Sequence, residues 1–204
     1  MPNAAPTPTI SKFEDVFAHA RYNKQNFGRH VACEVYQIEG NKILTIARMH
    51  DDYHDISLAI LIGPNLDIEA VAPKMDRIPY PVCSGAVEAY GRMVGLNVFK
   101  RGILKEVRDL VGRTAGCTHL FELVESTLRG LFAAMYSMRG FDIRDMLNVE
   151  EVRQVNLHSP LLNDTCHSFS NKTRDDKTFD VAVEKLTRKG IPVDKLSPIS
   201  RQGA

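Results

Sequence analysis

Hydrophobic and polar residues alternate along two stretches of the chain, residues 31–50 and residues 54–62. The first stretch is interrupted at residues 39–42, where Gly40 and Asn41 allow the positive φ angles that a tight hairpin needs. In the second stretch, hydrophobic residues from Ile56 onward follow His54 on one face. These alternations predict three antiparallel strands.

A fourth alternating stretch follows the turn at Gly63-Pro64-Asn65. In this stretch, LDIEAVA, Ile68 and Ala70 are expected to share one face. The four strands together predict an antiparallel β-meander that ends near Pro73.

After residues 79–81 the hydrophobic period changes to that of helices. The segments CSGAVEAYGRMVG and ILKEVRDLVG are short, whereas residues 117–138 carry a wide apolar stripe that predicts the central helix. Its members recur at steps of three and four residues: Leu120, Leu123, Val124, Leu128 and Leu131. A last helix, FDVAVEKLTRKG, should stop at Gly190. The expected fold class is α+β.

The domain organisation follows from length and composition. Residues 1–10 are rich in Pro, Ala and Thr, which is typical of a disordered tail. A chain of 204 residues favours one domain, expected over residues 11–204 with a C-terminal extension at about 171–204.

Composition excludes several partners and places. The net charge of +1 and the absence of Trp argue against a nucleic-acid partner, and no run reaches the roughly 18 apolar residues of a membrane span. No secretory signal is recognised and the four cysteines are widely spaced, so we expect a cytoplasmic protein with reduced thiols. A small-molecule substrate is expected, and a homodimer is the base-rate expectation.

The first candidate for chemistry is the segment from His50 to Asp55, which holds two imidazoles and three carboxylates between two strands. Such side chains suit Zn or Fe, and a carboxylate can orient an imidazole. The alternative is a solvated turn with one useful histidine. His54 weakens that alternative because it begins the apolar face of a strand.

The second candidate is Cys83, which the stiff segment Pro79-Tyr80-Pro81 delivers to the expected start of a helix. A helix N-terminus would favour its thiolate as a ligand or nucleophile. The alternative is a small buried hydrophobic residue.

The third and most specific candidate lies at the start of the central helix. Cys117 and His119 exceed what a helix cap requires, since Thr118 alone could cap the free amides. His119 and Glu122 should share one helical face, as a ligand pair or as base and orienter. The alternative is a core histidine bonded to a carbonyl. Cys166 and His167 form a weaker pair because adjacent side chains point in different directions.

These segments, in their order along the chain, resemble a bacterial family of unknown function, number 2889. The signature Gly116-Cys117-Thr118-His119-Leu120 is its specific part, and the likeness covers about residues 30 to 170. The resemblance implies an association with the catabolism of phenolic and other aromatic compounds. It favours an enzyme that acts on a small phenolic or acyl substrate.

Three hypotheses follow. The first is an enzyme: a lyase that performs a retro-aldol loss of an aldehyde or a side-chain elimination, or a hydrolase, with or without Zn or Fe. Its predicted catalytic residues are His54, Asp55, Tyr80, Cys117, His119 and Glu122, and its predicted metal ligands are His50, His54, Cys83, Cys117 and His119. The second is a metal or iron–sulfur carrier. The third is a structural or partner-binding domain without catalysis.

Overall fold

A computed structural model describes residues 13–14, 25–138, 143–158, 162–164 and 166–191 of the chain. The expected tail at residues 1–10 lies outside the described residues. The α+β fold class is confirmed: four antiparallel strands in the order β1-β2-β3-β4 are followed by a helical half. The strands are β1 (Arg29–Ile38), β2 (Lys42–Asp51), β3 (Asp55–Ile62) and β4 (Ile68–Arg77).

The hairpin between β1 and β2 forms where the alternation predicts it. A single 3-10 turn, Glu39–Asn41, joins the two strands, and Gly40 and Asn41 there have φ angles of 74° and 55°. Glycine adopts this left-handed conformation at no steric cost, and asparagine tolerates it better than most residues do. The turn chemistry therefore fixes the register of the first strand pair.

Strand β4 differs from the prediction in two respects. It does not end at Pro73 but continues to Arg77, because β4 is an edge strand and the missing N–H of a proline is tolerated there. A register shift opposite Leu61 and Ile62 also separates Ile68 from Ala70. Ile68 is buried and Ala70 is exposed, so the prediction that they share one face is wrong.

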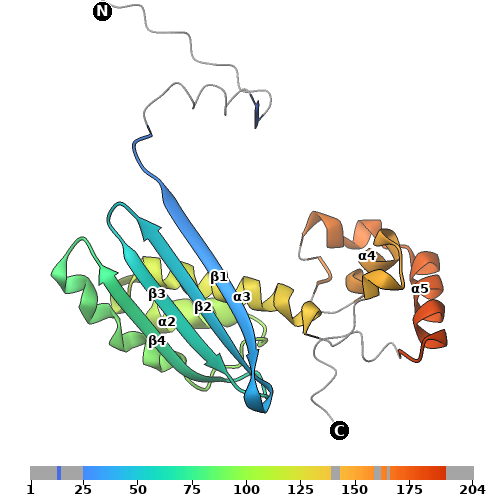
Figure 1. Cartoon of the computed structure of the whole chain (residues 1–204), viewed down its shortest axis with the longest axis horizontal. Helices are drawn as coiled ribbons and strands as arrows, with labels where there is room; N and C mark the ends of the chain where they lie inside the picture. The colour runs from blue at the N-terminus through green and yellow to red at the C-terminus, as the bar shows by residue number, and fades with distance from the viewer. Residues whose placement is uncertain (1–12, 15–24, 139–142, 159–161, 165, 192–204) are drawn as a thin grey trace, which may run out of the picture.

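The helices cover one face of the sheet. Helix α3 (Thr118–Ser137) lies across it and contacts β1, β2 and β3, with α2 (Ile103–Val111) beside it (Figure 1). The predicted stripe of α3 meets the inward face of β3, which is completely buried from Ile56 to Ile62 in alternate positions. Burying this apolar surface, at about 25 cal/mol per Å², is the main stabilisation of the fold.

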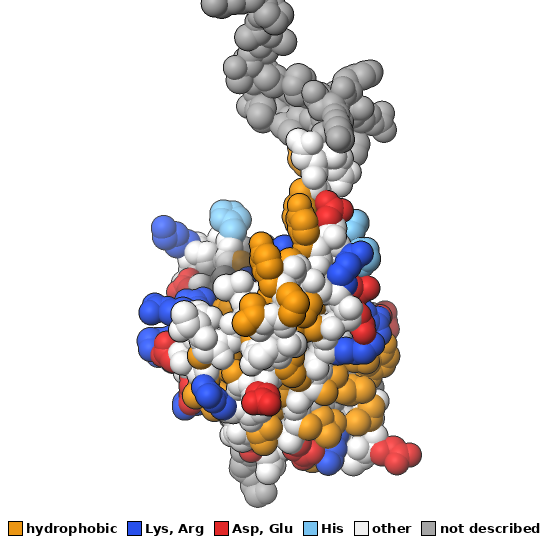
Figure 2. Space-filling view, turned by 90° about the vertical axis from the view of Figure 1, so that its left-hand side faces the viewer, with side chains coloured by type: hydrophobic (Ala, Val, Ile, Leu, Met, Phe, Trp, Pro, Cys, Tyr) orange, Lys and Arg blue, Asp and Glu red, His pale blue; other side chains and the backbone are white. Residues whose placement is uncertain are grey.

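Two 3-10 helices, η2 (Pro81–Ala86) and η3 (Glu88–Met93), join β4 to α2 where a longer helical period was predicted. Tyr80, Val82 and Val94 in this connection are exposed. Figure 2 shows a central band of hydrophobic side chains between charged ones on this side of the molecule.

A second, smaller hydrophobic cluster lies at the far end of α3 (Figure 1). It is formed by α4 (Val149–Leu157), α5 (Asp176–Arg188) and the turn at Ile143–Asp145. Helix α5 ends before Gly190, whose φ of 74° confirms the predicted stop. The single-domain organisation stays a prediction. No helix in the described parts of the chain is long and apolar enough to cross a membrane.

Candidate functional site

The turn between β2 and β3 is organised around the carboxylate of Asp51. One oxygen of Asp51 accepts hydrogen bonds from the backbone N–H groups of Tyr53 at 2.8 Å and His54 at 2.7 Å. Asp51 also donates its own backbone N–H to the carbonyl of His54 at 2.9 Å. Bonds of an aspartate to the backbone two and three residues ahead are those of an Asx turn. The turn therefore fixes the backbone that carries His54.

The same carboxylate orients the imidazole of His54. Nδ1 of His54 lies 2.9 Å from Oδ1 of Asp51, and the two side chains are 10% and 0% exposed. A carboxylate at Nδ1 makes that nitrogen the donor. Nε2 is then the nitrogen of His54 that can accept a proton.

Two arginines hold this turn from opposite sides. Nε of Arg29, on β1, donates to Oδ2 of Asp51 at 2.8 Å, and Nη1 of Arg29 lies 3.2 Å from Glu122 on α3. Arg77, on β4, donates to the backbone carbonyls of Asp51 and His54. The turn is thereby tied to both neighbouring strands and to α3.

Asp51 is ionised although it is buried. Burial acts to raise its pKa, but hydrogen bonds from the Tyr53 amide, His54 and Arg29 outweigh burial and hold the pKa well below its usual range. The carboxylate of Asp51 therefore carries a negative charge where it contacts the ring of His54.

The start of α3 presents a thiol. Cys117 is the N-cap residue, with extended backbone and no side-chain cap in the structure. The prediction that Thr118 caps the helix is therefore wrong, because the helix begins one residue earlier than that role requires and Thr118 is its first helical residue. The first amides of a helix lack partners within the helix, and the N-terminus favours negative charge nearby.

Close packing around Gly116 sets the position of Cys117. A Cβ atom at Gly116 would lie 2.0 Å from the carbonyl oxygen of Val111, so only glycine fits. The carbonyl of Cys117 accepts a hydrogen bond from the hydroxyl of buried Tyr90 at 2.7 Å and one from the backbone of Phe121 at 2.9 Å. The thiol is thus presented from a rigid backbone.

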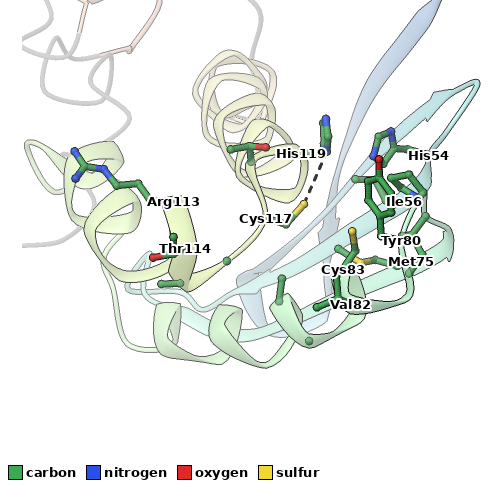
Figure 3. Close-up of a pocket in the computed structure, with 17 residues that line it drawn as sticks. His54, Ile56, Met75, Tyr80, Val82, Cys83, Arg113, Thr114, Cys117 and His119 are labelled. Carbon is green, nitrogen blue, oxygen red and sulfur yellow. Dashed lines mark hydrogen bonds between the residues drawn. The ribbon is translucent and has the colours of Figure 1, made fainter.

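His119 joins the thiol to the His54 turn. Its Nδ1 lies 4.0 Å from Sγ of Cys117, and its ring centroid lies 4.0 Å from that of His54 (Figure 3). Burial lowers the pKa of His119, and the nearby His54 and Arg29 lower it further against the opposing effect of Asp51 and Glu122. His119 is therefore a neutral base near pH 7.

These groups open into one cavity of about 620 Å³. The wall is mostly apolar, with Ile56, Met75 and Ile78 from the sheet side and Val82 from η2. Cavities of this size and character bind small molecules, and a few convergent polar groups then fix the orientation of the ligand.

The structure separates the residues predicted from the sequence into two groups. Five of them line the cavity: His54, Tyr80, Cys83, Cys117 and His119. His50 and Asp55 instead pair with each other at 3.6 Å, with side chains 61% and 50% exposed. Their strand positions are offset by one from those of the buried residues, so they point to the outer face. Glu122 lies outside the cavity wall and pairs with Arg29.

Sequence reasoning singled out neither Asp51 nor Arg29. Asp51 has a local signal, because an aspartate three residues before a histidine at a strand start can close an Asx turn. Arg29 has none, since its contacts with Asp51 and Glu122 span 22 and 93 residues.

Cys83 lies in the middle of η2 rather than at the start of an α-helix. A 3-10 helix of six residues has only a short dipole, so the predicted electrostatic effect on this thiol is lost. Cys166 and His167 are exposed and do not line the cavity. Among the described residues, no group of three His, Cys, Asp or Glu side chains is placed to hold a metal ion.

Comparison with known proteins identifies a family. The model of a family described as "Protein of unknown function (DUF2889)" matches residues 27–130, which include the sheet, the cavity and the first part of α3. The likeness was expected to extend to about residue 170, whereas the family match ends at residue 130, before Cys166 and His167. No curated protein and no solved structure matches the chain.

Proposed function

This chain belongs to the DUF2889 family, and from that premise we propose that it is a hydrolase that cleaves an acyl bond in a small, largely apolar substrate. One observation carries the proposal: His54, fixed by Asp51, lies against His119, which faces the sulfur of Cys117 at the wall of one cavity. A thiol, a neutral base and a carboxylate-oriented imidazole are the groups that acyl transfer through a thioester requires.

In the first half of the proposed reaction, the sulfur of Cys117 attacks the acyl carbon while His119 takes the thiol proton. The negative charge on the carbonyl oxygen is accepted by the unpaired amides at the start of α3. His119 then returns the proton to the leaving alcohol or thiol, and the acyl group remains on Cys117.

In the second half, water attacks the thioester and His54 takes its proton. Asp51 stabilises the resulting imidazolium through Nδ1. The C–S bond then breaks and releases the acid, and the proton held by His54 passes to the sulfur of Cys117, which returns to the thiol.

The cavity favours aromatic acyl groups over long charged ones. Its wall is mostly apolar, and Tyr80 lies at the wall, where its hydroxyl could bind a phenol. An ester or thioester of a hydroxylated aromatic acid is therefore the proposed substrate class. A cytoplasmic location is also our proposal, supported by four free cysteines.

A second candidate is a lyase that uses His54 as the base for an elimination or retro-aldol reaction. The favourable observation is that the Asp51–His54 pair is complete without Cys117. This reaction would leave no covalent adduct on the protein.

The test is hydrolysis of p-nitrophenyl esters and of thioesters of hydroxylated benzoic and cinnamic acids. We expect Cys117→Ala and His119→Ala to remove turnover, and mass spectrometry to find an acyl adduct on Cys117 of the wild type. Cys166→Ala is the matched control because its thiol is exposed and does not line the cavity.

Other outcomes decide among the hypotheses. Activity that survives Cys117→Ala but not His54→Ala would replace the hydrolase by the lyase. Stoichiometric Zn or Fe in untagged protein would favour a metal centre or carrier if the metal is lost in both Cys117→Ala and His54→Ala. Variants that change only the melting temperature, with no turnover in the wild type, would leave the structural hypothesis.

A further inference from the structure

Two cysteines line the same cavity from different elements. Cys83 comes from η2 and Cys117 from the start of α3, and both are free and partly buried. Figure 3 shows both side chains directed into the space between these two elements. The other two cysteines do not line this cavity: Cys33 lies on β1 and Cys166 is exposed.

The two sulfurs differ in how firmly they are held. Cys117 precedes a helix of 20 residues, and its carbonyl accepts hydrogen bonds from Tyr90 and Phe121. Its position is therefore fixed by the core.

Cys83 lies on η2, whose hydrogen bonds are mainly local. The hydrogen bonds found for η2 among the described residues run within residues 80–87, from Cys83 to Tyr80, from Ser84 to Pro81 and from Val87 to Ser84. None of the η2 residues is buried, and Val82 is 82% exposed. A segment with few buried contacts and local hydrogen bonds can be displaced at low cost.

We propose that Cys83 and Cys117 are a redox pair that forms a reversible disulfide across the cavity. Cys117 is the thiol that reacts with a peroxide, because it lies at the N-cap of α3 and its sulfur is 4.0 Å from His119, which can take its proton. Cys83 is the resolving thiol. The assignment of Cys117 as the reactive group rests on the proposed function.

The chemistry balances in two steps. The thiolate of Cys117 attacks one oxygen of the peroxide, which gives a sulfenic acid on Cys117 and releases water or an alcohol. The thiol of Cys83 then attacks the sulfenic sulfur, forms the disulfide and releases water. A dithiol reductant reverses the reaction by thiol–disulfide exchange.

Formation of this bond would close the site. A disulfide holds its two Cα atoms about 4.4–6.8 Å apart, and both thiols are free in the structure, so forming the bond would draw η2 and the start of α3 together. The movement narrows the cavity and caps the proposed nucleophile. The pair would therefore protect Cys117 from irreversible oxidation while it stops turnover.

The experiment uses the full chain, reduced and then treated with an equimolar amount of hydrogen peroxide. Non-reducing peptide mapping should find a Cys83–Cys117 cross-link in the wild type and in the controls Cys33→Ser and Cys166→Ser. In Cys83→Ser the cross-link should be absent, and dimedone should label Cys117 as sulfenic acid. A cross-link that involves Cys166, or oxidised Cys117 beside a freely alkylated Cys83, would overturn the proposal.

Recovery of activity provides a second readout. After dithiothreitol treatment, the wild type should regain most of its starting esterase rate, whereas Cys83→Ser should stay inactive at higher peroxide. The two proposals fail separately. A cross-link without any acyl adduct on Cys117 rejects the hydrolase and supports the redox pair. An acyl adduct without a cross-link rejects the redox pair and supports the hydrolase.

Discussion

Two histidine–aspartate pairs lie within six residues of each other in this chain, and their surroundings differ completely. In the first pair His54 contacts Asp51 at 2.9 Å inside the protein. In the second, His50 lies 3.6 Å from Asp55 on the outer face of the sheet. Residue type cannot distinguish them, so burial and tertiary partners decide which histidine is held in one orientation.

The energetic reason is solvent screening. Water competes with the exposed pair for hydrogen bonds and weakens its Coulomb attraction, and such pairs contribute about 0–1 kcal/mol. The buried Asp51 has no such competition and is bonded by His54, Arg29 and two backbone amides. His50 and Asp55 are therefore the matched controls for His54 and Asp51.

The largest difference is expected in catalysis. His54→Gln should lower kcat/KM for the best ester or thioester substrate by about 10²- to 10⁴-fold, since it removes the proposed proton acceptor. His50→Gln should change it less than twofold. Steady-state kinetics on both variants checks this, and equal effects would show that the buried pair has no special role.

The next difference concerns stability. Asp51→Asn should lower the free energy of unfolding by about 3 kcal/mol, because it breaks a buried charge network and leaves Arg29 without its shortest ion pair. Asp55→Asn should cost less than about 0.5 kcal/mol. Urea denaturation measures both. Similar midpoints for the two variants would contradict the assignment of Asp51 as the anchor of the turn.

A related difference should appear in the pH dependence of stability. The pKa of Asp51 is lowered in the folded state, so its contribution is present above the unfolded value near 4 and is lost as the pH falls toward the folded value. The stability difference between the wild type and Asp51→Asn should therefore shrink as the pH is lowered from about 5 to 2. Thermal unfolding over this range tests the sign, and Asp55→Asn should run parallel to the wild type.

The smallest difference is expected for the arginines. Arg29→Gln should destabilise the protein by about 1–2 kcal/mol, because Arg29 joins Asp51 to Glu122 and its side chain is only 28% exposed. Arg48→Gln is the control, since Arg48 pairs with exposed Glu34 at 3.4 Å and the substitution should cost about 0–0.5 kcal/mol. Arg29→Lys should recover part of the loss. Chemical denaturation of the three variants would reveal a reversed order if Arg29 were merely a surface residue.

Much of the fold could be predicted from local pattern. The alternation along β2 and β3, the Gly40-Asn41 turn and the apolar stripe of α3 depend on neighbours that are close in sequence. The wrong predictions for β4 concern positions where strand pairing overrides a local sequence rule. Pro73 is accommodated by an edge strand, and the bulge between Ile68 and Ala70 depends on the pairing of β4 with β3.

The candidate site was only partly predictable. The Gly116-Cys117 start of α3 and the buried position of His54 follow from periodicity and from the close backbone approach that glycine allows. The choice of Asp51 rather than Asp55 does not, because both are aspartates near the same histidine. The side chain of one faces the core and that of the other faces outward.

The sequence by itself determined the strands, the main helices and the position of a thiol and an imidazole at the start of α3, since these follow from side-chain periodicity and glycine conformation. The tertiary structure alone decided that His54, Cys83, Cys117 and His119 share one cavity, and that Arg29 supports Asp51 across 22 residues. The physical reason is that burial and hydrogen bonding between distant segments depend on how the sheet and helices pack, which no short stretch of residues encodes.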